Sequence, residues 1–321
     1  MRLRRNGNAL CDGMQKDGIM IHMFTILAVV GAAWLGANAL HGAWVAARRW
    51  RWDRRYVRDA DRLLPKAAAY QVGAGRIALL FIHGFADTPY LWRRIADRLA
   101  AGGTFTCRAM RLPGSAGTAA QAKRTSLAQW RSQIDAELTR LRETHEAVWI
   151  VGHSMGGALA LDAALRLPAQ VDGVALFAPL VEVSRKRCPF FPAHVWFDFA
   201  RVALCLSPVF ELPFSLNVVA GDDPTFTYPR DRFFPFAMYC ALFQLVRSNR
   251  KQAARLACPL FAVTAGRDSV VDSVAARHWL AACSAVPRKD IRDLPEAKHV
   301  IPLAPGWKTL FDDFAAFVLG T

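Results

Sequence analysis

A serine flanked by glycines, at the junction of a strand-like and a helix-like pattern, constrains the fold of this chain more than any other feature. The apolar run 148–151 leads directly into Gly152-His-Ser-Met-Gly156, and a helical pattern rich in small residues follows. In the order strand, sharp turn, helix, the two glycines leave room for a strained backbone that holds the serine hydroxyl out at the end of a sheet. The sequence therefore predicts that Ser154 is a nucleophile.

Short apolar runs alternate with amphipathic stretches from residue 67 to residue 321. The expected strands are 77–82, 105–110, 147–151, 171–177, 260–265 and one near Ile291. The expected helices are 90–101, 126–144, 155–167, one that starts at Asp272, and 307–319. Strands separated by helices indicate a mostly parallel sheet that is covered by helices on both faces. We therefore predict an α/β domain over residues 67–321.

Residues 181–257 interrupt this alternation and are rich in Phe, Pro and Leu. Their aromatic residues do not fit the rhythm of the sheet, whereas a helical cap inserted over its catalytic end would explain them. An apolar cap predicts an apolar substrate pocket. The alternative, which stays open at this point, is that the aromatic residues only pack the cap on its domain.

The N-terminal segment has the pattern of a membrane anchor. Residues 18–47 contain no Asp, Glu, Lys or Arg, and about twenty apolar residues suffice to cross a bilayer. Seven Lys and Arg residues lie within 48–62, with tryptophans nearby as in an interfacial belt, against four before residue 18. By the positive-inside rule we expect a single-pass anchor in a bacterial inner membrane, with the domain that follows on the cytoplasmic side.

Two other interpretations of this segment remain. It resembles a cleaved signal peptide, because Ala37-Asn38-Ala39 matches a cleavage site, and it could be a core helix. Residues 1–17 are expected to lack structure or to precede the real start at Met20 or Met23, and residues 48–66 are expected to form a basic linker.

Charge does not point to a nucleic-acid partner. The net charge is +15, but residues 1–66 hold twelve Lys and Arg against five Asp and Glu, so about half of the excess is N-terminal. No zinc-ligand spacing or helix-turn-helix signal accompanies the remainder, and we expect no nucleic-acid binding.

A second loop supplies candidate donors for a developing oxyanion. His83-Gly84-Phe85 comes directly after the first buried strand. There the backbone N–H of Phe85 could face the reacting carbonyl, with the N–H of Met155 as the second donor. Two such donors are what a tetrahedral intermediate needs.

An acid and a base follow the serine in the order found in hydrolases of this architecture. Asp268 ends one expected strand, and His299 follows another. His299 would take the proton from Ser154, while Asp268 would orient the imidazole and stabilise its charge. Asp272 remains an alternative for the acid.

Taken together, His83-Gly84-Phe85, Gly152-His-Ser-Met-Gly156, Gly266-Arg-Asp268 and Lys298-His299 resemble the α/β-hydrolase superfamily, and within it the bacterial carboxylesterases, monoacylglycerol lipases and lysophospholipases. The resemblance covers about residues 76–319. It implies the α/β-hydrolase fold, a triad of Ser154, Asp268 and His299, and an oxyanion hole of Phe85 and Met155. It also implies that neither a metal nor an organic cofactor is needed.

The sequence therefore predicts a membrane-tethered serine hydrolase that cleaves carboxylic esters of lipid-like or medium-chain acyl groups through an acyl-enzyme. A thioesterase, an amidase or peptidase, or a lactonase would use the same triad. A hypothesis of another class is a non-catalytic module that binds membrane surfaces. Three intact triad residues argue against this module, because a scaffold has no use for them.

Overall fold

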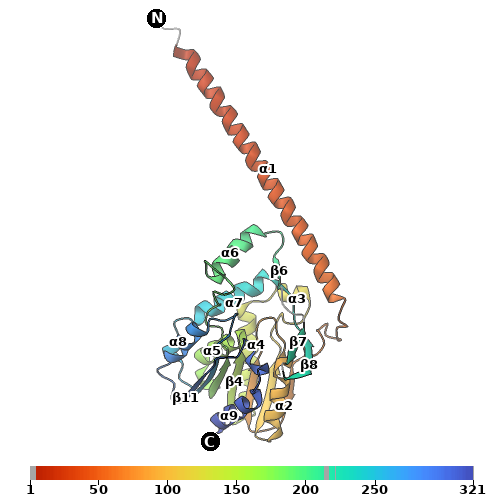
Figure 1. The fold of residues 1–321 in the computed structure, drawn as a ribbon, viewed down its shortest axis with the longest axis vertical. Coiled ribbons are helices and arrows are strands. Elements are labelled where there is room, and N and C mark those ends of the chain that lie inside the picture. Colours follow the sequence, from red (N-terminus) through yellow and green to blue (C-terminus); the bar gives the residue numbers. More distant parts are fainter. Residues whose placement is uncertain (1–4, 213–216, 221, 321) are drawn as a thin grey trace.

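A seven-stranded sheet forms the centre of the domain (Figure 1). The computed structural model describes residues 5–212, 217–220 and 222–320. The strand order is β1-β3-β2-β4-β5-β10-β11, in which β1 is antiparallel to β3 and all the other pairs are parallel. This confirms the expected mostly parallel sheet. The strands are β1 (Tyr70–Val72), β2 (Ile77–Ile82), β3 (Phe105–Met110), β4 (Ala147–His153), β5 (Gly173–Phe177), β10 (Leu260–Ala265) and β11 (Lys289–Leu294).

Helices cover both faces of this sheet. In β2, Leu79 and Phe81 face a core shared with α2 and α9, whereas Leu80 and Ile82 face a core shared with α4 and α5. Because both faces are buried, the central strands read as nearly continuous apolar runs. The helices of the domain outside the cap are η1 (Pro89–Trp92), α2 (Arg93–Ala101), α3 (Ala119–Lys123), α4 (Leu127–Arg142), α5 (Met155–Arg166), η2 (Pro168–Gln170), α8 (Ser273–Ala281), η4 (Ile301–Leu303) and α9 (Trp307–Leu319).

The segment between β5 and β10 forms the cap, and it is more than helical. Two helices are present as expected, but two short antiparallel ribbons, β6 with β9 and β7 with β8, were not expected. Their strands are short and two of them contain proline, so they carry little sequence signal. The cap elements are α6 (Ala193–Ala203), β6 (Val209–Glu211), β7 (Asn217–Ala220), β8 (Asp223–Pro229), β9 (Phe233–Pro235), α7 (Phe236–Asn249) and η3 (Ala253–Arg255).

The ribbon of β7 and β8 lies at the side of the sheet rather than over its catalytic end. Phe226 stacks on Tyr90 with ring centroids 5.1 Å apart, and Arg94 of α2 forms an ion pair with Asp222 at 3.0 Å. Figure 1 shows this ribbon beside α2. The cap above the site is therefore made mainly of α6, α7 and β9.

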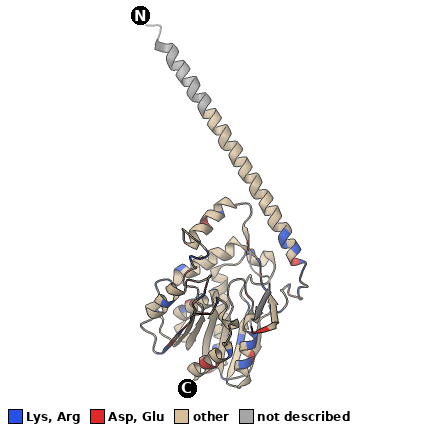
Figure 2. Ribbon diagram, in the orientation of Figure 1, with Lys and Arg blue, Asp and Glu red and all other residues tan. Residues whose placement is uncertain are grey.

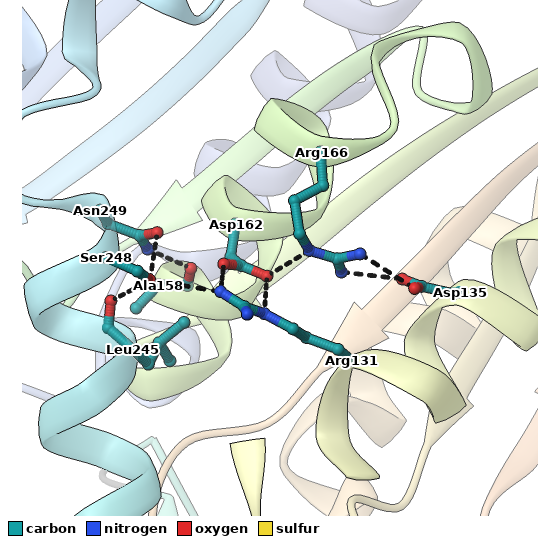
Figure 3. A network of polar contacts seen from close by, with 8 residues as sticks. All are labelled: Arg131, Asp135, Ala158, Asp162, Arg166, Leu245, Ser248 and Asn249. Atoms are coloured by element: carbon teal, nitrogen blue, oxygen red, sulfur yellow. Dashed lines mark hydrogen bonds and ion pairs between the residues drawn. The ribbon is translucent and has the colours of Figure 1, made fainter. Parts of the chain in front are cut away.

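Polar contacts fix the base of the cap to the helix that follows the serine (Figure 3). The Asn249 side chain, at the end of α7, donates to the carbonyl of Ala158 at 2.7 Å, and Asn249 is buried. One turn further along α5, buried Asp162 accepts hydrogen bonds from both Arg131 of α4 and Arg166. Because buried charges are stable only when paired, this network holds α4, α5 and α7 in one arrangement.

The N-terminal helix α1 (Arg5–Asp53) is longer than expected at both ends. Of the expected unstructured segment 1–17, residues 1–4 lie outside the described residues, and α1 begins at Arg5. The helix also continues through the first residues of the expected linker, where Arg48 stacks on Trp44 at 4.8 Å and Arg49 pairs with Asp53 at 3.8 Å. These pairs lie four residues apart, the spacing that brings side chains together on a helix.

By length and composition, the part Met20–Asp53 of α1 could cross a membrane. Its most apolar 18-residue window has a mean hydropathy of 1.8, and none of that window is buried in the domain. This disagrees with the interpretation as a core helix, because a core helix would be covered by protein.

Candidate active site

Ser154 occupies a strained turn between β4 and α5. Its φ is 56° and its ψ is −118°, a conformation that non-glycine residues rarely adopt. A Cβ on Gly156 would lie 2.1 Å from the carbonyl oxygen of Ile82, and a Cβ on Gly152 would lie 2.3 Å from that of Gly156. Both glycines are therefore needed for the close approach of α5 to the sheet, as the sequence pattern indicated.

Replacing Gly156 by alanine is expected to destabilise the fold by about 3 kcal/mol or more, because the new methyl group overlaps backbone atoms of β2 that cannot move independently. Thermal unfolding of the purified protein measures the effect. Gly36→Ala in α1 is the matched control, because nothing lies within 4 Å of the added Cβ. Equal melting temperatures for the two variants would contradict this account of the turn.

The structure brings Ser154, His299 and Asp268 together in a hydrogen-bonded chain. Nε2 of His299 lies 3.0 Å from Oγ of Ser154, and Nδ1 of His299 lies 2.7 Å from Oδ2 of Asp268. Ser154 and His299 are 145 residues apart in the sequence. They meet because β4 is parallel to its neighbours in the sheet, so its C-terminal end lies at the same edge as the C-terminal ends of β10 and β11.

The surroundings of Asp268 keep its carboxylate ionised. Burial alone would raise its pKa, but the hydrogen bond and charge of His299, with the N–H groups of Val270 and Val271, lower it below its ordinary value. Asp272 has a different place, because its carboxylate caps α8 by accepting from two backbone N–H groups at 3.0 Å. Of the two candidate acids, it is Asp268 that contacts His299.

The two candidate oxyanion donors lie on either side of the serine. Met155 is the first residue of α5, so its N–H has no partner within the helix. The loop that carries Phe85 lies against the turn: a Cβ on Gly84 would be 3.3 Å from Cβ of Ser154 and 3.1 Å from the ring of His153. A serine hydroxyl, a histidine hydrogen-bonded to it, a carboxylate on that histidine and two candidate backbone donors thus lie at one edge of the sheet, the set of groups that acyl transfer requires.

A family model described as the alpha/beta hydrolase family matches residues 79–307. The chain belongs to this family.

Similar proteins of this hydrolase family include a thermostable monoacylglycerol lipase from Bacillus sp. (strain H-257), which is 24% identical over 211 residues, or 65% of this chain and 77% of the relative. Among solved structures, one from work on LipS and LipT, two metagenome-derived lipolytic enzymes, has a TM-score of 0.68 at 22% identity and covers 81% of this chain and 100% of its own. The monoacylglycerol lipase of Paleococcus ferrophilus has a TM-score of 0.64 at 18% identity, over 78% and 98% of the two chains. These similarities support an ester hydrolase.

Two histidines support the loops of this hydrolase rather than the reaction centre. His83 accepts a hydrogen bond from the N–H of Leu112 at 3.2 Å, and burial lowers its pKa to about 4. His153 donates from Nε2 to the carbonyl of His299 at 2.9 Å, and burial lowers its pKa to about 3. Both rings therefore stay neutral at neutral pH and fix the loops on either side of Ser154.

Aromatic residues of the cap cover the oxyanion loop of the hydrolase. The ring of Phe85 lies 4.6 Å from that of Phe234 and 5.0 Å from that of Tyr239, and Tyr239 in turn packs on Phe197 of α6 at 5.6 Å. Other aromatic residues of the cap, including Phe190 and Phe199, are exposed. The inner set packs the cap against the site, whereas the exposed set faces outward. Packing of the cap on its domain therefore explains the inner aromatic residues but not the exposed ones.

Three residues that support the oxyanion loop, Asp87, Tyr228 and Arg230, were not predicted from the sequence. Arg230 donates to the carbonyl oxygens of Ala86 at 3.2 Å and Phe85 at 3.5 Å. Buried Asp87 accepts from the hydroxyl of Tyr228 at 2.9 Å. Tyr228 and Arg230 come from the cap, more than 140 residues along the chain, and no local pattern pairs them with the loop. They hold the loop through two of its backbone carbonyls and its buried carboxylate.

Arg230→Met is expected to lower kcat on a small ester by about tenfold or more, with little change in KM, because the Phe85 N–H loses its alignment while the pocket is kept. Steady-state kinetics on p-nitrophenyl acetate separates the effect on kcat from the effect on KM. Arg232→Met is the control, since Arg232 pairs with Glu211 in the cap and not with the loop. A change confined to KM would contradict a role in orienting the donor.

Proposed function

We propose that the chain is a membrane-tethered serine hydrolase that cleaves carboxylic esters through an acyl-enzyme. The observation that carries the proposal is the position of His299, 3.0 Å from Oγ of Ser154 on one side and 2.7 Å from the Asp268 carboxylate on the other. This is the geometry that a hydroxyl group needs to become a nucleophile at neutral pH.

In the proposed acylation step, Oγ of Ser154 attacks the ester carbonyl carbon while Nε2 of His299 accepts the hydroxyl proton. The ionised Asp268 stabilises the imidazolium that results and holds its Nδ1–H. The carbonyl oxygen becomes an oxyanion, which accepts hydrogen bonds from the N–H groups of Phe85 and Met155. Collapse of the tetrahedral intermediate breaks the C–O bond, and His299 returns its proton to the alcohol that leaves.

In the proposed deacylation step, His299 takes a proton from a water molecule, and the hydroxide attacks the acyl group on Ser154. The same two N–H groups stabilise the second oxyanion. The products are a carboxylic acid and the free serine, with the proton passed back to Oγ of Ser154.

The acyl group is proposed to be lipid-like or of medium length. The cap packs Phe234 and Tyr239 against Phe85, so aromatic rings surround the loop next to the serine. Apolar walls favour a hydrocarbon chain. The similarity to proteins described as monoacylglycerol lipases favours the same class of acyl group. A thioester, amide or lactone would meet the same triad, so the leaving group has to be determined by assay.

The tether is proposed to be α1, with the catalytic domain on the cytoplasmic side. None of its most apolar window is buried in the domain, and basic residues follow that window in the sequence. An anchor of this kind would keep the site where lipid esters concentrate.

Hydrolysis of p-nitrophenyl esters from acetate to palmitate by the full chain in detergent micelles tests the function. We expect a maximum at medium acyl length, with phenyl thioesters and anilides of the same acids turned over more slowly. Absence of turnover at every length, with a fluorophosphonate probe also failing to label Ser154, would overturn the hydrolase and favour the membrane-binding module.

A further inference from the structure

We propose that the exposed side of α6 lies in the surface of the bilayer that α1 crosses, so that the cap itself faces lipid. The proposal rests on the tether proposed above and adds a second, independent contact with the membrane. The partner of the exposed side of α6 is a lipid surface.

Helix α6 carries three different stripes. One stripe, which includes buried Phe197, faces the cap. A second stripe is polar and exposed, with Asp198 and Arg201 one turn apart. The third is apolar and exposed, and Phe199 and Val202 keep 66% and 67% of their surface accessible. With the loops on either side of α6, the third stripe comprises Phe191, Val195, Trp196, Phe199, Val202 and Leu206, which are all at least 40% exposed.

Hydrogen bonds fix the end of α6 to α1 at a defined position along the length of α1. The carbonyl of Ala203, at the end of α6, accepts from the ring N–H of Trp34 at 3.1 Å and from the side chain of Asn38 at 2.8 Å. One turn further along α1, Nδ1 of His41 lies 2.9 Å from the hydroxyl of Ser207. Figure 1 shows α6 beside α1, at the end of the domain from which α1 leaves.

The length of α1 then places α6 at the membrane. Residues 18–47 are free of charge and span about 45 Å as a helix, whereas the hydrocarbon core is roughly 30 Å thick. If the crossing begins at residue 18, it ends near Ala37, next to the residues that bind α6. If it ends at Arg48 instead, the same residues lie inside the hydrocarbon. In both placements the apolar stripe of α6 reaches lipid.

Charge and continuity favour lipid over a protein partner. Figure 2 shows most of α6 in tan, while the blue residues gather further along α1 and lower on the domain. The end of α6 binds Trp34 of α1, which is itself 41% exposed and lies within the accessible apolar part of that helix. An apolar surface that is continuous with a membrane-spanning helix is expected to contact lipid, as the helix does.

This placement links the bilayer surface to the site through packed aromatic side chains. The cap-facing stripe of α6 contacts Tyr239 through Phe197 with ring centroids 5.6 Å apart, and Tyr239 contacts Phe85 at 5.0 Å. The lipid-facing helix is therefore joined to the oxyanion loop by a chain of apolar contacts.

Fluorescent labels at two positions of α6 test the contact directly, without use of catalysis. The full chain is reconstituted in vesicles of phosphatidylcholine and phosphatidylglycerol, with Cys11, Cys188, Cys205, Cys240 and Cys258 replaced by serine. An environment-sensitive dye is attached at Phe199→Cys or, as the matched control on the polar stripe, at Arg201→Cys. We expect dye at position 199 to be quenched at least fivefold more by doxyl lipids than dye at position 201, and the order to reverse with aqueous iodide.

The outcomes separate the two proposals. A chain that does not float with vesicles in a density gradient would overturn the tether and the α6 contact together. A chain that floats, with position 199 quenched only by iodide, would overturn the α6 contact alone. Protection of position 199 from both quenchers would also overturn it, because a protein or a second copy would then cover the stripe.

A kinetic arm tests the consequence for substrate. The double variant Phe199→Asp, Val202→Asp is expected to raise KM for a long-chain ester dissolved in the vesicles by about tenfold, and to leave turnover of p-nitrophenyl acetate unchanged. Val274→Asp is the control. Val274 is an exposed apolar residue as well, with 52% of its surface accessible, but it lies in α8, away from α1. Equal KM values in the two variants would count against lipid contact.

Discussion

Alanine at position 154 is expected to reduce kcat on any accepted ester by about 10⁵- to 10⁶-fold, because the acyl-enzyme can no longer form. The residual rate would come from the oxyanion donors and from binding alone. The measurement is single-turnover hydrolysis of p-nitrophenyl butyrate by the full chain, with titration of active sites to exclude traces of unmodified enzyme.

Ser115→Ala is the matched control for this variant. Ser115 is also buried, with 3% of its surface accessible, but it lies in the loop after β3. Wild-type kcat in Ser115→Ala, together with normal melting temperatures in both variants, would tie the loss to the hydroxyl at position 154. A reduction of less than about a hundredfold in Ser154→Ala would exclude Ser154 as the nucleophile.

Asparagine at position 268 is expected to lower kcat by about 10⁴-fold with little change in KM. The amide keeps the shape of the carboxylate, but it cannot stabilise the imidazolium, and its NH₂ group favours the wrong tautomer of His299. Steady-state kinetics from pH 6 to pH 9 measures the loss, and the loss should persist across this range because Asp268 has a lowered pKa and is ionised throughout.

Asp272→Asn gives the matched control for the acid. Its side chain caps α8, and asparagine caps helices about as well as aspartate, so both activity and stability should stay close to those of the unmodified protein. If Asp272→Asn instead showed the larger loss of activity, the assignment of the acid would be wrong.

The central sheet could be read from the sequence because of its burial. Strands β2, β3 and β10 and helix α9 begin and end at the predicted residues. In the three strands nearly every side chain is buried, and β2 and β10 are nearly continuous apolar runs with sharp ends. By contrast, β1 is a three-residue edge strand with the pattern Tyr-Gln-Val, and so short a stretch carries no periodicity.

The candidate site was foreseeable for a similar reason. Ser154 and Asp268 each follow a strand whose position was clear, His299 follows one that was expected near Ile291, and parallel strands bring their C-terminal ends to one edge. Arg230 was not foreseeable, because it reaches the oxyanion loop from an insertion whose path depends on contacts far apart in the sequence. The division of the cap aromatics into an inner and an outer set was hidden as well, since composition does not reveal which side of α6 meets protein.

The packing of α1 on the cap divides this helix into two parts that would tolerate mutation differently. From Met20 to Ala33 the side chains are nearly all exposed, so many apolar substitutions would serve there equally well. From Trp34 onward the inward positions fit individual partners: Trp34 donates to the carbonyl of Ala203, Arg48 pairs with Glu211, and Trp52 packs on Phe233. Among related chains we therefore expect the first part to drift freely in sequence while the second part changes only together with α6, β6 and β9. Exchange of the whole helix for a foreign anchor would then disturb the cap, whereas exchange of the first part alone would not.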